Sequence, residues 1–344
     1  MPASKSPLLV TGAAGFIGSN FVRMAVERGV GPIVALDSLT YAGNLENLAD
    51  LLEGDKIAFE KADIRDADAM TTVFEEHGIR RVAHFAAESH VDRSIMGSAD
   101  FVTTNVVGTQ VLLDLAKAAE VTRFLNVGTD EVYGTLPEDQ PEVKFTEETP
   151  LQPNSPYSAS KAGGDCLCRA YYETHKMPVL ITRCSNNYGP YQFPEKLIPL
   201  FVTNLMEGKQ VPLYGDGLNI RDWLHVSDHC DAILTVLEKG TPGEVYNVGG
   251  NNEQTNRAIT EKLIDLCGRS WDEAVTYVED RKGHDRRYAI DASKIKAELG
   301  WEPKRRWDEA IAETVDWYKS NRDWWQSIKS GAYRDYYEKQ YANR

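Results

Sequence analysis

Residues 7–18 read PLLVTGAAGFIG, and in this stretch a short apolar run leads into Gly12, Gly15 and Gly18. The apolar run predicts a buried strand, and the apolar spacing over residues 21–26 predicts a helix directly afterwards. Glycines in such a turn let the backbone approach a phosphate, and the helix N-terminus offers N–H groups and a favourable dipole. The stretch therefore predicts a phosphate-binding turn between a first strand and a first helix.

A second apolar run, residues 33–36, ends at Asp37. An acid at this distance from a glycine loop is placed to hydrogen-bond the ribose of an adenosine. Because an acid repels a 2′-phosphate and no Arg follows it closely, NAD is favoured over NADP. The alternative, in which Asp37 is only a turn residue at a strand end, is less favoured.

Strand and helix patterns then alternate. A strand at 57–59, a helix at 67–77, a strand at 82–86, a long helix at 99–119 and a strand leading to residue 130 follow one another. This alternation predicts an α/β protein with a Rossmann-type, doubly wound parallel sheet and right-handed crossovers.

Beyond a strand at 179–183 the pattern becomes irregular, and residues 185–199 are typical of a loop. Helical apolar spacing returns at 259–267 and 307–318. We expect a smaller, mostly C-terminal α/β substrate lobe beside the NAD-binding domain. The domain is predicted over 1–184 with returns at 224–250 and 305–320, and the lobe over 185–223 and 251–344.

The composition restricts the class of protein. The chain has 344 residues, of which 42% are hydrophobic, and no apolar run reaches the length of a membrane span. Residues 1–12 enter a strand with no signal-peptide pattern, so we expect a cytoplasmic protein. A net charge of −14 argues against nucleic acid and anionic membrane as partners. Five scattered cysteines predict reduced structural thiols and no metal site.

Residues 124–133 read FLNVGTDEVY and place Thr129, Asp130 and Glu131 at the end of a buried strand, where open α/β sheets bind ligands. Two adjacent acids there repel each other, and an isolated pair would turn into solvent. Neighbouring side chains on a strand point to opposite faces, so the acids can converge only if the chain leaves extended geometry at Thr129. We predict that it does.

Tyr157 and Lys161 are four residues apart and share one face of a predicted helix, with Ser155 as its N-cap and Pro156 at its first position. An ammonium beside a phenol favours the phenolate, which lowers the pKa of the Tyr toward that of a useful base. On its own such a pair is usually an ordinary helix surface. Together with the two acids it predicts proton-transfer chemistry.

With these features assembled, the chain resembles the extended short-chain dehydrogenase/reductase family over nearly its full length, through TGAAGFIG, Asp37, YSASK and DASKIKAELGW. Within that family it resembles the nucleotide-sugar 4,6-dehydratases, most specifically those that act on dTDP-glucose. The distinguishing strings are DSLTYAG (37–43), AAESHVDRS (86–94), TDEVYG (129–134), NNYGPYQFPEKLIP (186–199), LYGDG (213–217) and DRKGHDRRYAID (280–291). Two departures are Gly128, where the family often has a small hydroxyl residue, and Ser38, where it commonly has Lys.

The resemblance implies an NAD-dependent dehydration of dTDP-glucose to the 4-keto-6-deoxy sugar nucleotide. Tyr157 would take the C4 hydroxyl proton as hydride passes to NAD, Lys161 would lower the Tyr157 pKa and hold the nicotinamide ribose, and Thr129 would hydrogen-bond the C4 oxygen. Glu131 would then remove the C5 proton and Asp130 would protonate the leaving C6 hydroxyl, before hydride returns to C6. This division requires a protonated Asp130 beside an ionised Glu131.

The resemblance also implies two binding sets. Cofactor contacts are expected from Gly12, Gly15, Phe16, Ile17, Gly18, Asp37, Ser38, Leu39, Thr40, Asp63, Ile64, Phe85, Ala86, Ala87, Ser89, Thr104, Tyr157, Lys161 and Asn187. Substrate contacts are expected from Ser89, Thr129, Asn186, Lys196, Leu197, Pro212, Tyr214, Arg221, Asn256, Arg281 and His284. Lys196, Arg221 and Arg281 are the cations that a diphosphate requires in an acidic protein, although each alone would be read as a surface charge.

Other functions remain open. A UDP- or CDP-glucose 4,6-dehydratase would share the mechanism. A sugar-nucleotide 4-epimerase or decarboxylase would need Tyr157 and Lys161 but not the two acids, and a non-catalytic NAD-binding regulator would need none of them. The family also implies a homodimer formed by the helices at 99–119 and 157–175.

Overall fold

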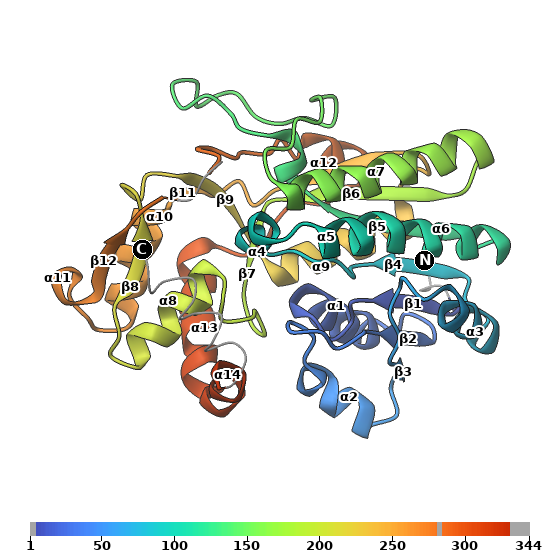
Figure 1. Ribbon diagram of the computed structural model, residues 1–344, viewed down its shortest axis with the longest axis horizontal. Coiled ribbons are helices and arrows are strands. Elements are labelled where there is room, and N and C mark those ends of the chain that lie inside the picture. The colour runs from blue at the N-terminus through green and yellow to red at the C-terminus, as the bar shows by residue number, and fades with distance from the viewer. Residues whose placement is uncertain (1–4, 281–283, 331–344) are drawn as a thin grey trace.

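A parallel sheet of seven strands forms the centre of the protein, in the order β10-β6-β5-β4-β1-β2-β3 (Figure 1). The structure is a computed structural model and describes residues 5–280 and 284–330. Every strand pair in this sheet is parallel. The strands are β1 (Leu8–Thr11), β2 (Ile33–Leu36), β3 (Ala58–Glu60), β4 (Arg81–His84), β5 (Arg123–Thr129), β6 (Val179–Cys184) and β10 (Val245–Val248).

Alternate residues of the buried strands face two separate apolar layers. Leu8 and Val10 of β1 lie in one layer, and Leu9 lies in the other. The first layer is covered by α1 (Phe16–Glu27) and α9 (Val226–Lys239). The second is covered by α3 (Ala67–His77), α6 (Thr109–Ala118) and α7 (Pro156–His175). Helices on both faces of a parallel sheet confirm the predicted Rossmann-type, doubly wound fold.

The predicted long helix at 99–119 is interrupted. It comprises α5 (Ala99–Val102), a π-helical segment η2 (Thr103–Gly108) and α6. In the π-helical segment Asn105 is buried and donates to the Glu88 carbonyl and the Ser160 hydroxyl, at 2.9 and 2.8 Å. These tertiary hydrogen bonds stabilise a local geometry that apolar spacing does not reveal.

A second group of elements forms the lobe, with its own apolar core and two small sheets, ordered β11-β9-β7 and β12-β8. Its strands are β7 (Asn186–Tyr188), β8 (Val211–Tyr214), β9 (Ile220–His225), β11 (Glu253–Thr255) and β12 (Val275–Val278). The predicted loop at 185–199 thus contains a short strand and the start of α8. The lobe helices are α8 (Leu197–Met206), α10 (Asn256–Leu266), α11 (Trp271–Ala274), α13 (Trp307–Ser320) and α14 (Arg322–Lys329).

Two late helices pack on different cores. Residues 305–320, predicted as a return to the NAD-binding domain, contain α13, which packs on α8 and α10 in the lobe core. Helix α12 (Ser293–Leu299) contacts β10 and α9 and contributes Ile295 to the first apolar layer. The amphipathic pattern of both segments predicts a helix but not the core that it joins. The division of the chain into two domains stays a prediction.

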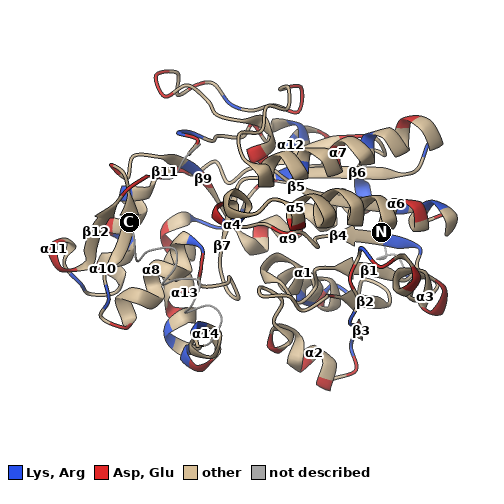
Figure 2. Ribbon diagram, viewed as in Figure 1, with Lys and Arg blue, Asp and Glu red and all other residues tan. Residues whose placement is uncertain are grey.

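Shorter helices connect these elements: η1 (Leu45–Leu48), α2 (Ala49–Glu53), α4 (Val91–Met96) and η3 (Asp130–Tyr133). Outer helices such as α6 and α14 carry both acidic and basic residues (Figure 2). Within residues 5–280 and 284–330, no helix is long and apolar enough to cross a membrane.

Candidate active site

A cavity of about 610 Å³ lies at the carboxyl ends of the central strands and reaches the lobe segment around Lys196. Most of the predicted site residues line it. They are Gly12, Gly15, Phe16, Ile17, Gly18, Asp37, Ser38, Thr40, Asp63, Ile64, Phe85, Ala86, Ala87, Ser89, Thr104, Thr129, Asp130, Glu131, Tyr157, Lys161, Asn186, Asn187, Lys196 and Leu197. Segments far apart in sequence therefore meet at the edge where open α/β sheets bind ligands.

Gly12 and Gly18 of the glycine loop have no room for a side chain. Gly12 has a φ of +67°, and a Cβ there would lie 2.7 Å from the Ala86 nitrogen. A Cβ on Gly18 would lie 2.1 Å from the Gly12 carbonyl oxygen. Helix α1 follows at Phe16 without a side-chain cap on its first N–H groups. A tight turn with these N–H groups at a cavity wall fits the pyrophosphate of a dinucleotide.

Asp37 lies at the far side of this loop. Its carboxylate accepts hydrogen bonds from the backbone N–H groups of Ala14 and Leu39, at 3.0 and 2.8 Å. Burial raises the pKa of Asp37, while these two bonds lower it. Leu39 itself does not line the cavity but packs against the apolar layer of α1, so its predicted cofactor contact is not seen here.

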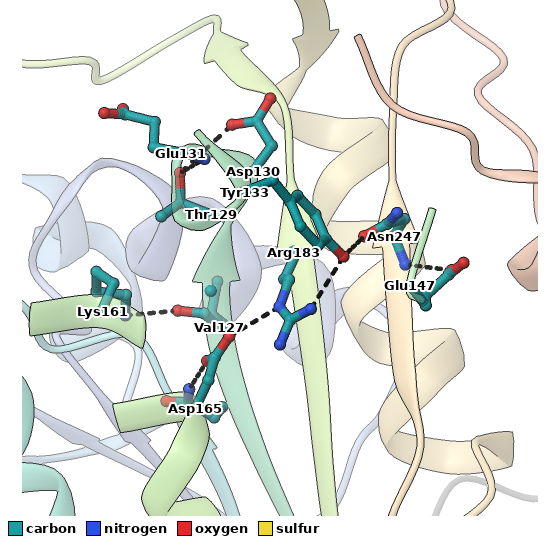
Figure 3. A network of polar contacts seen from close by, with 12 residues as sticks. Val127, Thr129, Asp130, Glu131, Tyr133, Glu147, Lys161, Asp165, Arg183 and Asn247 are labelled. Carbon is teal, nitrogen blue, oxygen red and sulfur yellow. Dashed lines mark hydrogen bonds and ion pairs between the residues drawn. The ribbon is translucent and has the colours of Figure 1, made fainter. Parts of the chain in front are cut away.

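The two acids follow the predicted change in backbone geometry. Thr129 is still extended, with φ −142° and ψ 149°, and the 3₁₀-helix η3 begins at Asp130. The Thr129 hydroxyl accepts from the Glu131 N–H at 3.3 Å and donates to Asp130 Oδ1 at 3.4 Å. Both acids consequently lie beyond the end of β5 (Figure 3), and both line the cavity. The chain thus leaves extended geometry at Asp130, one residue later than predicted. Figure 3 shows the two carboxylates pointing to opposite sides of the strand end, so their convergence on one substrate stays a prediction.

Asp130 is buried, with 1% of its surface exposed, and its Oδ2 has no hydrogen-bond partner among the described residues. Burial raises its pKa well above the usual value, and the neighbouring charges of Glu131 and Asp222 raise it further, whereas Arg221 opposes them. Burial and acidic neighbours favour the protonated form of a carboxyl. Asp130 is therefore suited to donate a proton.

Tyr157 and Lys161 lie on α7, which begins as predicted, with Pro156 in its first turn and a capping box between Ser155 and Ser158. The Lys161 Nζ donates to the Val127 carbonyl at 2.8 Å (Figure 3). This bond directs the ammonium to the end of β5.

The expected pKa shift of Tyr157 is wrong in direction. Burial raises the Tyr157 pKa well above 10, with Glu131 and Cys184 adding to the rise, and a hydrogen bond with Thr129 opposes it. Burial also lowers the pKa of Lys161, while Asp165 raises it. The prediction rested on the charge of Lys161, one helical turn away. Desolvation of the buried phenol has the larger effect, so the neutral form of Tyr157 is favoured.

Five further predicted substrate contacts do not line this cavity, and their roles stay predictions. Tyr214 is on β8, with its ring centroid 6.3 Å from that of His284. Arg221 is buried, donates to the Asp285 carbonyl at 2.7 Å and lies over the Tyr288 ring. Pro212 and Asn256 are buried in the lobe, and Arg281 is outside the described residues.

Several cavity residues were not singled out from the sequence: Arg65, Asp100, Cys184, Gln192, Glu195 and Trp223. Glu195 is the most notable, because its side chain is 2% exposed and lies 3.5 Å from Arg93. Glu195 directly precedes Lys196 in the string 186–199, which supports the family resemblance. This position is the sequence feature that could have identified Glu195 as a site residue. Burial raises the Glu195 pKa, and Lys196 and Arg93 lower it.

This geometry defines a class of protein. A glycine loop, a ribose-binding acid and a Tyr–Lys pair around one cavity are the parts of a nucleotide-dependent enzyme of the short-chain dehydrogenase/reductase type. The two acids at the end of β5 add a second proton-transfer pair.

Comparisons with known proteins narrow the class. The chain matches the GDP-mannose 4,6 dehydratase family over residues 9–314. It is 53% identical to dTDP-glucose 4,6-dehydratase of Xanthomonas campestris pv. campestris, over 95% of this chain and 97% of that protein. The chain belongs to the dTDP-glucose 4,6-dehydratase family.

Solved structures agree. DesIV, a dTDP-glucose 4,6-dehydratase from Streptomyces venezuelae with NAD and TYD bound, superposes with a TM-score of 0.90 at 52% identity, covering 94% of this chain and 100% of DesIV. UDP-glucose 4-epimerase from Thermotoga maritima superposes with a TM-score of 0.84 at 30% identity, covering 92% and 99%. The scaffold is thus shared with enzymes of another activity, and the site residues must distinguish them.

The buried proton on Asp130 predicts a pH dependence of stability. Folding raises the pKa of Asp130, so the protonated carboxyl stabilises the folded state relative to the unfolded chain. This stabilisation is fully present below about pH 4, where Asp130 titrates in the unfolded chain. It is lost as the pH rises through the pKa of Asp130 in the folded protein. An amide at this position does not titrate, so the Asp130→Asn variant does not lose stability in this way. Urea unfolding should therefore show the variant gaining stability relative to wild type as pH rises from about 4 to 8.

Asp139→Asn, at an exposed loop residue, is the matched control and should keep the wild-type pH slope. If the free energy of unfolding changed with pH equally in Asp130→Asn and Asp139→Asn, Asp130 would not be buried in its protonated form.

Proposed function

We propose that the protein is an NAD-dependent dTDP-glucose 4,6-dehydratase that acts in the cytoplasm and forms dTDP-4-keto-6-deoxyglucose. The observation that carries this proposal is the acid pair, in which Asp130 is buried, with a raised pKa, and lines the same cavity as Glu131 and Tyr157. Elimination of water needs one proton donor and one proton acceptor on the same sugar, and this pair supplies both.

The reaction needs an oxidised intermediate because the C5 hydrogen of a hexose is not acidic until C4 is a ketone. Bound NAD would supply the hydride acceptor for this oxidation and the hydride for the later reduction at C6. The residues fit such a group, since the Gly12 and Gly18 turn forms a cradle that a Cβ would fill, and Asp37 lies at the position for a ribose. Lys161 and Tyr157 line the same cavity.

Tyr157 accepts the C4 hydroxyl proton in this proposal. Because burial holds the Tyr157 pKa high in the structure, the phenol needs added positive charge before it can act as a base. Lys161 can supply that charge, one turn further along α7, if its ammonium leaves the Val127 carbonyl. Thr129, which is hydrogen-bonded to Tyr157, is placed to hold the C4 oxygen.

Elimination then uses the two acids. Glu131 removes the C5 proton, and Asp130 gives its proton to the C6 hydroxyl, which leaves as water. When hydride arrives at C6, C5 takes a proton back from Glu131, and Asp130 is reprotonated from solvent. General acid–base assistance of this kind contributes about 10² to 10⁴ in rate per group.

The alternatives differ in their use of this pair. A 4-epimerase on the same scaffold oxidises and reduces C4 and has no step for a protonated Asp130 beside Glu131. A non-catalytic NAD-binding regulator has no use for either acid. UDP- or CDP-glucose would undergo the same chemistry, because the thymine methyl contributes only about 1 to 3 kcal/mol of discrimination.

Incubation with dTDP-glucose tests the function directly. The purified protein should yield the 4-keto-6-deoxy product, detected by mass spectrometry as loss of water, with higher kcat/KM for dTDP-glucose than for UDP- or CDP-glucose. Formation of dTDP-galactose would indicate the epimerase, and an unchanged substrate would indicate the regulator.

Asp130→Asn tests the role of the acid. The amide keeps the side-chain shape but cannot donate a carboxylic proton, so elimination should slow by about 10² or more while C4 oxidation continues. Stopped-flow absorbance should show reduced nicotinamide accumulating in the variant. Unchanged turnover would contradict the assignment.

We further propose a homodimer formed by α5–α6 and α7. Val102 and Val107 support it, because both are apolar and about half exposed, at 48% and 44%. Replacing both with Glu should shift the sedimentation coefficient to that of a monomer. The matched control is the double variant Leu218→Glu/Tyr277→Glu on the lobe, where the exposures are 45% and 54%. A dimer that survived the first pair would contradict this interface.

A further inference from the structure

Two buried charges lie beside β5 and outside the cavity. Asp165 on α7 and Arg183 on β6 form an ion pair, with Nε 2.8 Å from Oδ2, and their side chains are 1% and 7% exposed. Burying such a pair costs free energy unless further hydrogen bonds satisfy both groups. The function described so far uses neither residue.

Both charges are satisfied through a network that reaches two parts of the active site (Figure 3). Asp165 Oδ1 accepts from the Asn126 amide at 2.9 Å, and Asp165 lies one helical turn after Lys161 on α7. Arg183 Nη1 donates to the Tyr133 hydroxyl at 3.0 Å. That hydroxyl donates in turn to Asn247 Oδ1 on β10, at 2.7 Å.

Tyr133 is the last residue of η3, the four-residue turn that begins with Asp130 and Glu131. Its ring is stacked on Phe145 with centroids 5.0 Å apart, and burial raises its pKa to about 12, so the hydroxyl keeps its proton. Arg183 therefore connects the turn that carries the acids to the helix that carries Tyr157 and Lys161.

Gly128 leaves space for this connection. It pairs with Arg183 across β5 and β6, and a Cβ there would lie 2.7 Å from the Thr182 carbonyl oxygen and 3.4 Å from Arg183 Cγ. The same Cβ would lie 3.3 Å from Asp165 Oδ1. A small hydroxyl residue at this position would crowd the ion pair in this chain.

We propose that Tyr133 and Arg183 are positioning residues for the acid–base step. Asp130 has little else to fix its carboxyl, since Oδ2 has no partner among the described residues and Oδ1 has only the 3.4 Å contact with Thr129. Its placement thus depends on the backbone of η3. The Tyr133 hydroxyl holds the far end of that turn against β6 and β10.

Tyr133→Phe tests this inference, which rests on the proposed dehydratase function. Phe keeps the stacked ring but releases η3 from Arg183 and Asn247. A small displacement of catalytic groups lowers rates strongly, so kcat for dTDP-glucose should fall about tenfold to a hundredfold, with KM changed less than about twofold. Because C4 oxidation depends on Tyr157 and only elimination depends on the acids, the steady-state fraction of reduced nicotinamide should rise.

Tyr246→Phe is the matched control. Tyr246 precedes Asn247 on β10, is also buried, and donates its hydroxyl proton to Glu298 outside the network. It should lower the thermal midpoint as Tyr133→Phe does, but leave kcat and the reduced fraction at wild-type values. Arg183→Lys, which retains the charge but loses the planar fork, should shift both quantities in the direction of Tyr133→Phe.

The outcomes are distinguishable. If wild type converts dTDP-glucose and neither Tyr133→Phe nor Arg183→Lys differs from Tyr246→Phe in kcat and reduced fraction, the network is only structural and the inference is overturned. If wild type gives no product, the proposed function fails before the variants are compared.

Discussion

Burial of the Asp130 carboxyl at the end of β5 is the constraint on which the chemistry depends. A carboxyl in water is ionised at neutral pH and cannot serve as a proton donor. Burial and the nearby acids Glu131 and Asp222 raise the pKa of Asp130 well above its ordinary value. The buried carboxyl destabilises the fold at neutral pH, but it provides a proton donor next to the proposed base Glu131.

The rest of the structure places this carboxyl. Strand β5 ends at the cavity, the 3₁₀ turn places both acids beyond the strand end, and α7 presents Tyr157 and Lys161 to the same cavity. The Thr129 hydroxyl is hydrogen-bonded to Tyr157, donates to the Asp130 carboxyl and accepts from the Glu131 backbone N–H. Because α7 and the turn come from separate parts of the chain, their relative placement needs long-range contacts such as those of Arg183.

Features with local causes could be predicted from the sequence. The glycine loop, Asp37 at its strand end and the Ser155 cap each depend on residues within a few positions, and the structure contains all three. A turn near Thr129 was also predictable, because neighbouring side chains on a strand point to opposite faces, and η3 begins at Asp130.

Features set by tertiary contacts could not be predicted. The π-helical segment depends on Asn105 bonding to Glu88 and Ser160, and the ion pair joins Asp165 to Arg183 on another element. The apolar spacing at residues 307–318 predicted a helix with one buried face, but it did not show which apolar core that face joins. The shift of the Tyr157 pKa depends on burial, which spacing along a helix does not report.

The protonation of Asp130 is the central claim, and infrared spectroscopy measures it most directly. The difference spectrum between wild type and Asp130→Asn at neutral pH should contain the carbonyl stretch of one protonated carboxylic acid, present in wild type and absent from the variant. A difference spectrum that contains only carboxylate bands would show that Asp130 is ionised, and it would contradict this account of the site.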